Sequence, residues 1–173
     1  KIAVAWSLLQ HDLVPNMIGW EYGILAFESK CEWLIYPCKD TTALTRMRTP
    51  ITGGGTSMGK VLDMAWSWAR VHCNQARFIL ESDGEPTDMT KSEILAMVTK
   101  NKSIPIDTVG IGSNKQSLFC SYDPRFLKEI SQLTGGTFSE ANSTKAFVDI
   151  IVKLSPAMRP LLGPAQEGGV KND

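Results

Sequence analysis

Two absences limit what this sequence can be: it has no excess of charge of either sign, and it has no long apolar run. Eighteen basic residues balance eighteen acidic ones over 173 residues, so no net field would draw the chain to nucleic acid. No apolar run approaches the roughly twenty residues that a membrane-spanning helix needs. The sequence carries no signal peptide and starts at Lys1 rather than Met, as a sequence without its first segment would. We therefore expect a cytoplasmic protein that does not span a membrane.

Cysteine and histidine are scarce, and their spacing favours neither a zinc site nor catalysis. The four cysteines form no C-x-x-C pair. Cys31 and Cys38 flank one expected strand, which would hold them roughly 23 Å apart and prevent a disulfide. Both histidines fall on expected helices, where a surface position is the ordinary outcome, and no Ser-His-Asp set is present. We therefore expect no catalytic residue and no enzyme activity.

Apolar residues recur with helical and strand periods along most of the sequence. Thr90-x-x-Glu93 forms a capping box that begins a helix. Asp123 precedes a proline at the first position of another helix, which Gly135 ends. The expected order is helix 2–13, strands 20–27 and 32–36, helix 58–69, strand 76–80, a helix from 91, strand 104–111, a helix from 124, strand 137–139 and a final helix that ends before Pro156.

Helices that alternate with strands predict an α/β fold, with a doubly wound, mostly parallel sheet flanked by helices. We expect one domain over residues 1–157 and a flexible tail over residues 158–173, which contain several glycines. In such folds ligands bind at the carboxyl ends of the strands, where the glycine loop at 53–55 and the turn at Asp83 both fall.

The stretch from Gly54 to Lys60 has two interpretations. The first is a phosphate-binding loop, because Gly54, four residues and then Gly59-Lys60 match the G-x-x-x-x-G-K pattern. The chain would then be a nucleotide-binding hydrolase that uses Lys60. However, Val61 stands where that motif needs a serine or threonine for magnesium. Residues 46–50, before the loop, also lack the apolar character of a buried strand.

The second interpretation rests on several motifs that occur in a fixed order. They are Gly23–Phe27, Gly54–Thr56, Phe78–Asp88, Ile106–Gly112, and Phe126–Ile130 with Thr134–Phe138. In this order and spacing they resemble the von Willebrand factor type A domain, over about residues 1–155. The resemblance implies a protein-interaction or assembly module, such as a scaffold or adaptor, rather than a catalyst.

The resemblance also implies a site. In that family a divalent cation, usually magnesium, sits in a metal-ion-dependent adhesion site made of oxygen ligands. By resemblance the threonine of that site is Thr56 and the aspartate is Asp83. A glutamate or aspartate of a protein partner would complete the coordination of the ion. Further candidate binding residues lie beside these two: Gly55, Ser57, Gly84 and Glu85.

Two parts of the family pattern are absent from this sequence: the first strand and the Asp-x-Ser-x-Ser loop that follows it. Oxygens from Thr56 and Asp83 alone are too few to hold magnesium, so a metal-free scaffold fits the sequence equally well. The missing strand would lie in the sheet between strands 20–27 and 78–80. An upstream segment, a strand from a partner chain or the C-terminal tail would fill this slot, unless the two flanking strands pair directly with each other.

Three further residues near these motifs have other expected roles. Asp88 and Asp123 lie at turns, where capping or turn formation is the simplest role for an aspartate. Trp68 lies off the apolar stripe of its helix, so it marks a candidate contact surface.

Overall fold

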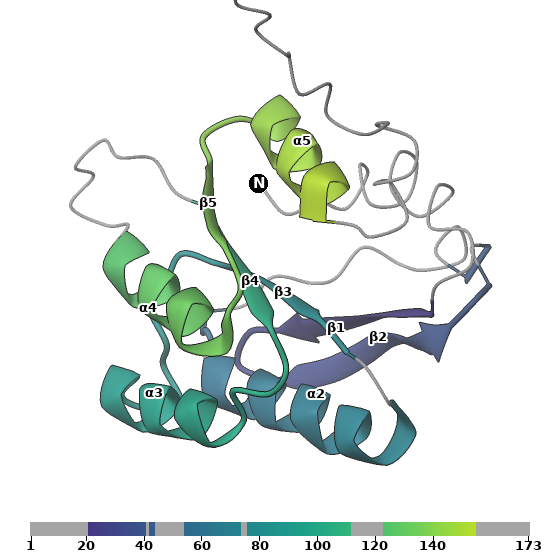
Figure 1. Cartoon of the computed structure of the whole chain (residues 1–173), viewed down its shortest axis with the longest axis horizontal. Helices are drawn as coiled ribbons and strands as arrows, with labels where there is room; N and C mark the ends of the chain where they lie inside the picture. The colour runs from purple at the N-terminus through teal and green to yellow at the C-terminus, as the bar shows by residue number, and fades with distance from the viewer. Residues whose placement is uncertain (1–20, 41, 44–53, 74–75, 112–122, 155–173) are drawn as a thin grey trace, which may run out of the picture.

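The computed structural model describes residues 21–40, 42–43, 54–73, 76–111 and 123–154. Figure 1 shows the elements in these ranges. They are β1 (Tyr22–Phe27), β2 (Cys31–Cys38), α2 (Met58–His72), β3 (Phe78–Ser82), α3 (Lys91–Lys100), β4 (Ile106–Ile111), α4 (Pro124–Thr134), β5 (Phe138–Ala141) and α5 (Thr144–Leu154). Each matches an expected element to within a few residues. The expected helix over 2–13, the domain boundary at 157 and the flexible tail over 158–173 lie outside the described residues.

The strands form two sheets. In the first, β4 lies between β3 and β5, and both pairs are parallel; Leu80 faces Thr108, and Thr108 faces Phe138. In the second, β1 and β2 form an antiparallel hairpin with irregular register near Ile24. Within the described ranges β1 and β3 do not pair with each other. The direct pairing that would have closed the expected slot between them is therefore not observed.

A single apolar cluster lies on one face of the parallel sheet and is covered by α2, α3 and α4. β3 contributes Leu80 and β4 contributes Ile106, and both side chains are buried against these helices. From the hairpin, Leu25 and Phe27 pack against the same cluster. The helices contribute most of the fully buried side chains: Met58, Trp66, Ile94, Val98, Leu127 and Ile130. Helix α2 thus packs on both sheets and holds the hairpin beside β3.

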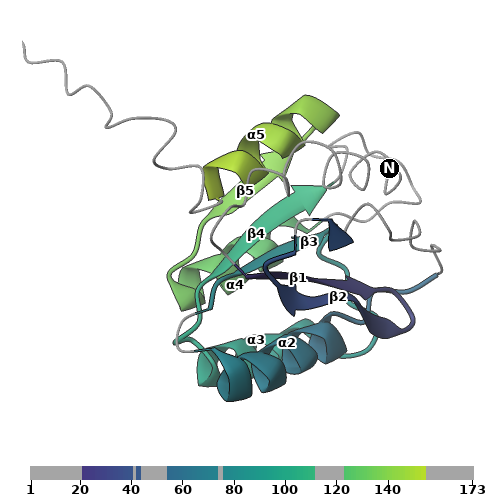
Figure 2. The same ribbon diagram turned by 90° about the vertical axis from the view of Figure 1, so that its right-hand side faces the viewer.

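The opposite face of the parallel sheet is covered by α5. Phe147 and Ile151 of α5 pack against Val109 of β4 and Ala141 of β5. Figure 2 shows α5 on one side of the strands and α2 and α3 on the other. The α/β fold with helices on both faces is therefore confirmed. Among the described strands only three form a parallel sheet, and β1–β2 is a separate hairpin, so the doubly wound arrangement stays a prediction.

A buried ionic cluster fastens the amino ends of β3 and β4. The Asp107 side chain is fully buried and pairs with the guanidinium of Arg77, whose Nη2 donates to Oδ1 over 2.7 Å. The backbone N–H and the hydroxyl of Thr137 also donate to Oδ1, each over 2.8 Å. Burial alone would raise the pKa of Asp107, but the bonds from Arg77 and Thr137 prevail and hold this pKa below its usual range.

The ionic cluster predicts a pH-dependent loss of stability. Asp107→Asn should lower the free energy of unfolding by about 2 kcal/mol at pH 7, because the charge-assisted bonds to Arg77 are weakened. The folded-state pKa lies below the unfolded-state value of about 4, so the stabilisation is complete above that value and is lost as pH falls through the folded-state pKa. Urea unfolding of both proteins from pH 7 to pH 3 measures this. Glu129→Gln, at an exposed position, is the control; a difference that stays constant over this pH range would contradict the assignment.

Candidate functional site

The glycine loop is held tightly against two neighbouring segments. A Cβ atom on Gly55 would lie 3.2 Å from Thr87 Oγ1 and 3.3 Å from the backbone nitrogen of Ser29, in the turn between β1 and β2. The N–H of Thr56 donates to Thr87 Oγ1 over 2.8 Å, and the N–H of Thr87 donates to the Thr56 carbonyl over 2.9 Å. The N–H of Ser57 donates to the Glu28 carbonyl over 2.8 Å. These bonds fix the backbone of Thr56, and its hydroxyl has no hydrogen-bond partner among the described residues.

The Asp83 turn directly follows β3 and needs a glycine. Gly84 has φ +84°, and a Cβ there would lie 2.6 Å from the carbonyl oxygen of Asp123. The N–H of Gly84 donates to Ser82 Oγ, and the N–H of Glu85 donates to Asp83 Oδ1, each over 3.1 Å. The Asp83 carbonyl accepts from the N–H of Asp123 over 2.9 Å. The turn is thus fixed at both ends, while the Asp83 side chain remains exposed.

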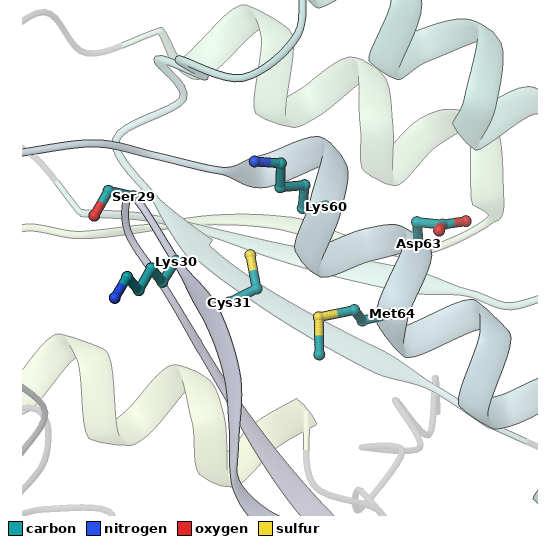
Figure 3. A pocket seen from close by; sticks show the side chains of 6 residues that line it. All are labelled: Ser29, Lys30, Cys31, Lys60, Asp63 and Met64. Carbon is teal, nitrogen blue, oxygen red and sulfur yellow. The ribbon is translucent and has the colours of Figure 1, made fainter.

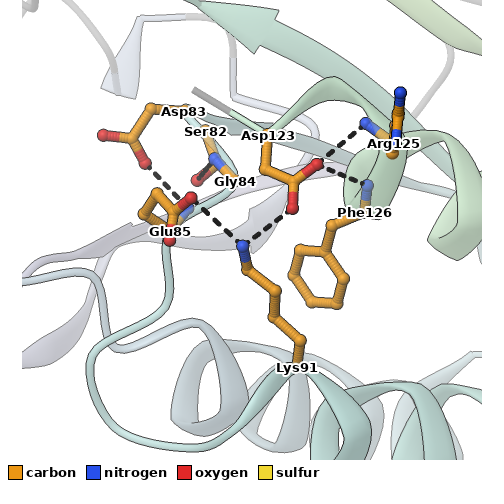
Figure 4. A network of polar contacts seen from close by, with 8 residues as sticks. All are labelled: Ser82, Asp83, Gly84, Glu85, Lys91, Asp123, Arg125 and Phe126. Atoms are coloured by element: carbon orange, nitrogen blue, oxygen red, sulfur yellow. Dashed lines mark hydrogen bonds and ion pairs between the residues drawn. The ribbon is translucent and has the colours of Figure 1, made fainter. Parts of the chain in front are cut away.

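Glu85 is not a free carboxylate, because it forms an ion pair with Lys91. Lys91 Nζ lies 3.1 Å from Glu85 Oε1 and 2.7 Å from Asp123 Oδ2. Figure 4 shows both carboxylates directed toward Lys91, while Asp83 Oδ1 bonds to the backbone of Glu85. Asp123 Oδ1 accepts from the N–H groups of Arg125 and Phe126, which caps α4 as expected. Burial alone would raise the pKa of Asp123, but Lys91 and the cap bonds prevail and lower it.

The amino end of α2 is capped by an aspartate that follows β3. Ser57, at the N-cap position, makes no side-chain cap bond. Instead Asp88 accepts from the N–H of Gly59 over 3.2 Å and from the N–H of Lys60 over 2.9 Å. A Cβ on Gly59 would overlap the sulfur of Met89. The expected capping or turn role of Asp88 is confirmed, although the helix that it caps lies 28 residues earlier in the chain.

The predicted site residues lie on two segments, the glycine loop and the Asp83 turn, which contact each other through Thr87. Thr56 and the segment after Asp83 are joined by the two Thr56–Thr87 bonds. Gly55 and Gly84 allow close backbone approach, Ser57 is buried, and Glu85 pairs with Lys91. No group of three or more histidine, cysteine or acidic side chains that could hold a metal occurs in the described ranges. Sequence reasoning missed Thr87 and Lys91, because only their partners in space reveal their roles.

Comparison with known proteins adds information at the level of structure. No protein-family model matches the sequence, and no curated protein matches it. An aerotolerance-related membrane protein from Bacteroides fragilis superposes with a TM-score of 0.65 at 16% identity, over 88% of this chain and 86% of the other. BatB from Bacteroides thetaiotaomicron gives a TM-score of 0.61 at 18% identity, over 90% and 87%.

A third solved structure carries a domain name that matches the resemblance. The ArnB paralog VWA2 from Sulfolobus acidocaldarius gives a TM-score of 0.62 at 20% identity, over 86% of this chain and 37% of the other. The chain has a von Willebrand factor type A-like fold. At these identities the likeness establishes the fold and leaves the chemistry of the site to be argued from the residues.

The comparisons also correct one expectation. We expected a cytoplasmic location, and this is wrong, because the neighbour from B. fragilis is a membrane protein. The scarcity of long apolar runs was too weak a signal for compartment. Within the described ranges no helix has the length and apolar character needed to cross a bilayer.

The Asp83 turn predicts unequal effects for two glycine substitutions. Gly84→Ala should lower the free energy of unfolding by at least about 2 kcal/mol, because the new Cβ meets both an unfavourable φ and the Asp123 carbonyl. Gly135→Ala is a matched control: its φ is +72°, but no atom lies within 4 Å of the added Cβ. It should cost only about 1 kcal/mol. Urea denaturation measures both, and equal losses would refute the close approach at Gly84.

Proposed function

We propose that this chain is a protein-interaction module that docks its partner at the edge formed by the glycine loop and the Asp83 turn. One observation carries the proposal. Hydrogen bonds fix the backbones of Thr56 and Asp83, but the Thr56 hydroxyl has no partner among the described residues and the Asp83 side chain is exposed. Preorganised polar groups of this kind suit recognition, because little entropy is lost when they bind. The fold supports the same class of function.

A divalent cation is part of this proposal. The Thr56 hydroxyl and the Asp83 carboxylate are hard oxygen donors, which fit magnesium in kind. They do not fit it in number, since the ion takes six ligands. We propose that an Asp-x-Ser-x-Ser loop outside this sequence and an acidic side chain of the partner supply further oxygens. A strand from an upstream segment or a partner would precede that loop. It would lie between β1 and β3, which do not pair with each other in the described ranges, and pair with both.

The alternative, a nucleotide-binding hydrolase, loses its main structural support. A phosphate loop binds phosphate through backbone N–H groups at the start of its helix. Here the N–H groups of Gly59 and Lys60 donate to the Asp88 carboxylate. A negative charge at this position would also repel a phosphate. We propose no catalytic residue, and we look for partners among membrane-associated assemblies, since one structural neighbour is a membrane protein.

Manganese can test the cation site directly, because Mn²⁺ takes the same oxygen ligands as Mg²⁺ and broadens nearby NMR signals. We expect Mn²⁺ to broaden amide signals around Thr56 and Asp83 first. Asp83→Ala and Thr56→Val should weaken this effect at least about tenfold, whereas Thr56→Ser, which keeps the hydroxyl, should retain it. Asp63→Ala is the control for an exposed aspartate. Broadening that survives Asp83→Ala would remove Asp83 from the site.

ATP tests the alternative. We expect no ATP affinity that depends on Lys60, because the amides at the start of α2 are already bonded to Asp88. Isothermal titration of the chain and of Lys60→Ala with ATP and Mg²⁺ measures this. Micromolar affinity that disappears in Lys60→Ala would overturn the interaction module in favour of the hydrolase.

A further inference from the structure

A second surface lies where β2 packs on α2. One end of it adjoins the glycine loop, because the Cys31 thiol donates to the Ser57 carbonyl over 3.5 Å. We call this surface the β2–α2 seam, formed by Cys31, Trp33 and Tyr36 of β2 and Met64, Trp68 and His72 of α2. Among the described residues β2 pairs only with β1, so its outer edge has no strand beside it. An unpaired edge presents a row of backbone N–H and C=O groups to any added strand.

Four rings run across the seam in contact with one another. Trp33 stacks on Tyr36 with centroids 5.5 Å apart and meets the edge of Trp68 at 5.9 Å. Trp68 in turn stacks on His72 at 4.8 Å. The row is not covered at its end, because Tyr36 is 65% exposed. Trp68 itself is half-buried in this row, so its expected role as a contact surface stays a prediction.

The other end of the seam is a basic hollow. It encloses about 460 Å³ and is lined by Ser29, Lys30, Cys31, Lys60, Asp63 and Met64. Figure 3 shows Lys60 directed toward the hairpin turn, Asp63 directed away from it, and the Cys31 and Met64 side chains between the strand and the helix. Neither lysine forms an ion pair within the described part of the chain. Burial raises the pKa of the Cys31 thiol, so its side chain is a neutral part of the floor.

On both sides of the seam, residues recur at nearly the same spacing as side chains on one face of an extended chain. On α2, Lys60, Met64 and Trp68 follow one another at four-residue intervals, which rise about 6 Å each. On β2, Cys31 and Trp33 are two residues apart, a rise of roughly 6.7 Å. In an added strand, the side chains on one face also recur about every 6.7 Å. Successive side chains on the face of the added strand that points toward α2 would therefore lie against Lys60, then Met64, and then the tryptophans.

We propose that the β2–α2 seam binds an extended acidic peptide segment, which adds antiparallel to the outer edge of β2. A carboxylate of the peptide lies between Lys30 and Lys60, and apolar side chains two and four residues before it cover Met64 and Trp68. The charge of the hollow selects an acid over a base, and the edge of β2 that is unpaired among the described residues supplies backbone bonds. Antiparallel addition continues the pairing that β2 already has with β1.

Two matched peptides test the proposal with the whole chain in solution. The probes are fluorescein-labelled, amidated Thr-Leu-Thr-Leu-Thr-Glu-Thr and its twin with lysine in place of glutamate, measured by anisotropy in the presence of EDTA. We expect the acidic probe to bind at least about tenfold more tightly. The double variant Lys30→Glu/Lys60→Glu should reverse this preference. The control Lys100→Glu/Lys128→Glu changes two exposed lysines elsewhere, alters net charge equally and should leave the preference unchanged.

The location of binding separates this proposal from the cation-dependent site. Amide chemical shifts should change along 31–36, and binding should persist in Asp83→Ala and without divalent ions. Equal affinity for the two probes, no binding at millimolar concentration, or shifts confined to the Asp83 turn would each overturn the proposal. A dimer seen in sedimentation would also overturn the proposal, provided that it buries residues 31–36 and that the acidic probe does not dissociate it. The edge of β2 would then bind a second copy of the chain.

Discussion

The packing of α2 on both sheets is the constraint on which the rest of the molecule depends. The hairpin β1–β2 shares no strand pairing with β3 in the described ranges, so its attachment relies mainly on side-chain packing, together with the bond from the Ser57 N–H to the Glu28 carbonyl. Leu25 and Phe27 reach the cluster that contains Met58 and Trp66 of α2, and Leu80 of β3 reaches it from the other sheet. Burial of side chains this large contributes about 1.5–3 kcal/mol each. The positions of the glycine loop and of the Asp83 turn follow from this contact.

These two loops are ordered by hydrogen bonds and ion pairs rather than by apolar burial. Thr87 bonds to Thr56 in both directions, and Asp88 reaches the start of α2. On the other side of the turn, Lys91 joins Glu85 to Asp123. The Thr56 hydroxyl has no described partner and the Asp83 side chain is exposed, so the interaction that we propose would use these two groups. Fixing the supporting shell first is how a site acquires a defined geometry.

Local signals in the sequence were enough to predict most elements. The capping box at Thr90, the cap at Asp123 and the left-handed Gly135 all occur as expected, because each depends on residues within one helical turn. Contacts between distant segments could not be predicted in the same way. The Arg77–Asp107 pair forms only once β3 and β4 lie side by side, and no periodicity marks it. For the site, the sequence placed Thr56 and Asp83 at one edge, but it could not show that Glu85 would turn toward Lys91.

The cap on α2 has a consequence for how the chain folds. Because Asp88 lies 28 residues after Lys60, the first turn of α2 gains its cap only after β3 has docked and the intervening loop has closed. Closing a loop of this length costs entropy that a local cap would not require. The start of α2 is therefore among the later parts of the helix to become stable. The glycine loop attached to it should become ordered at the same stage, so the edge that we propose for recognition forms only when both sheets are in place.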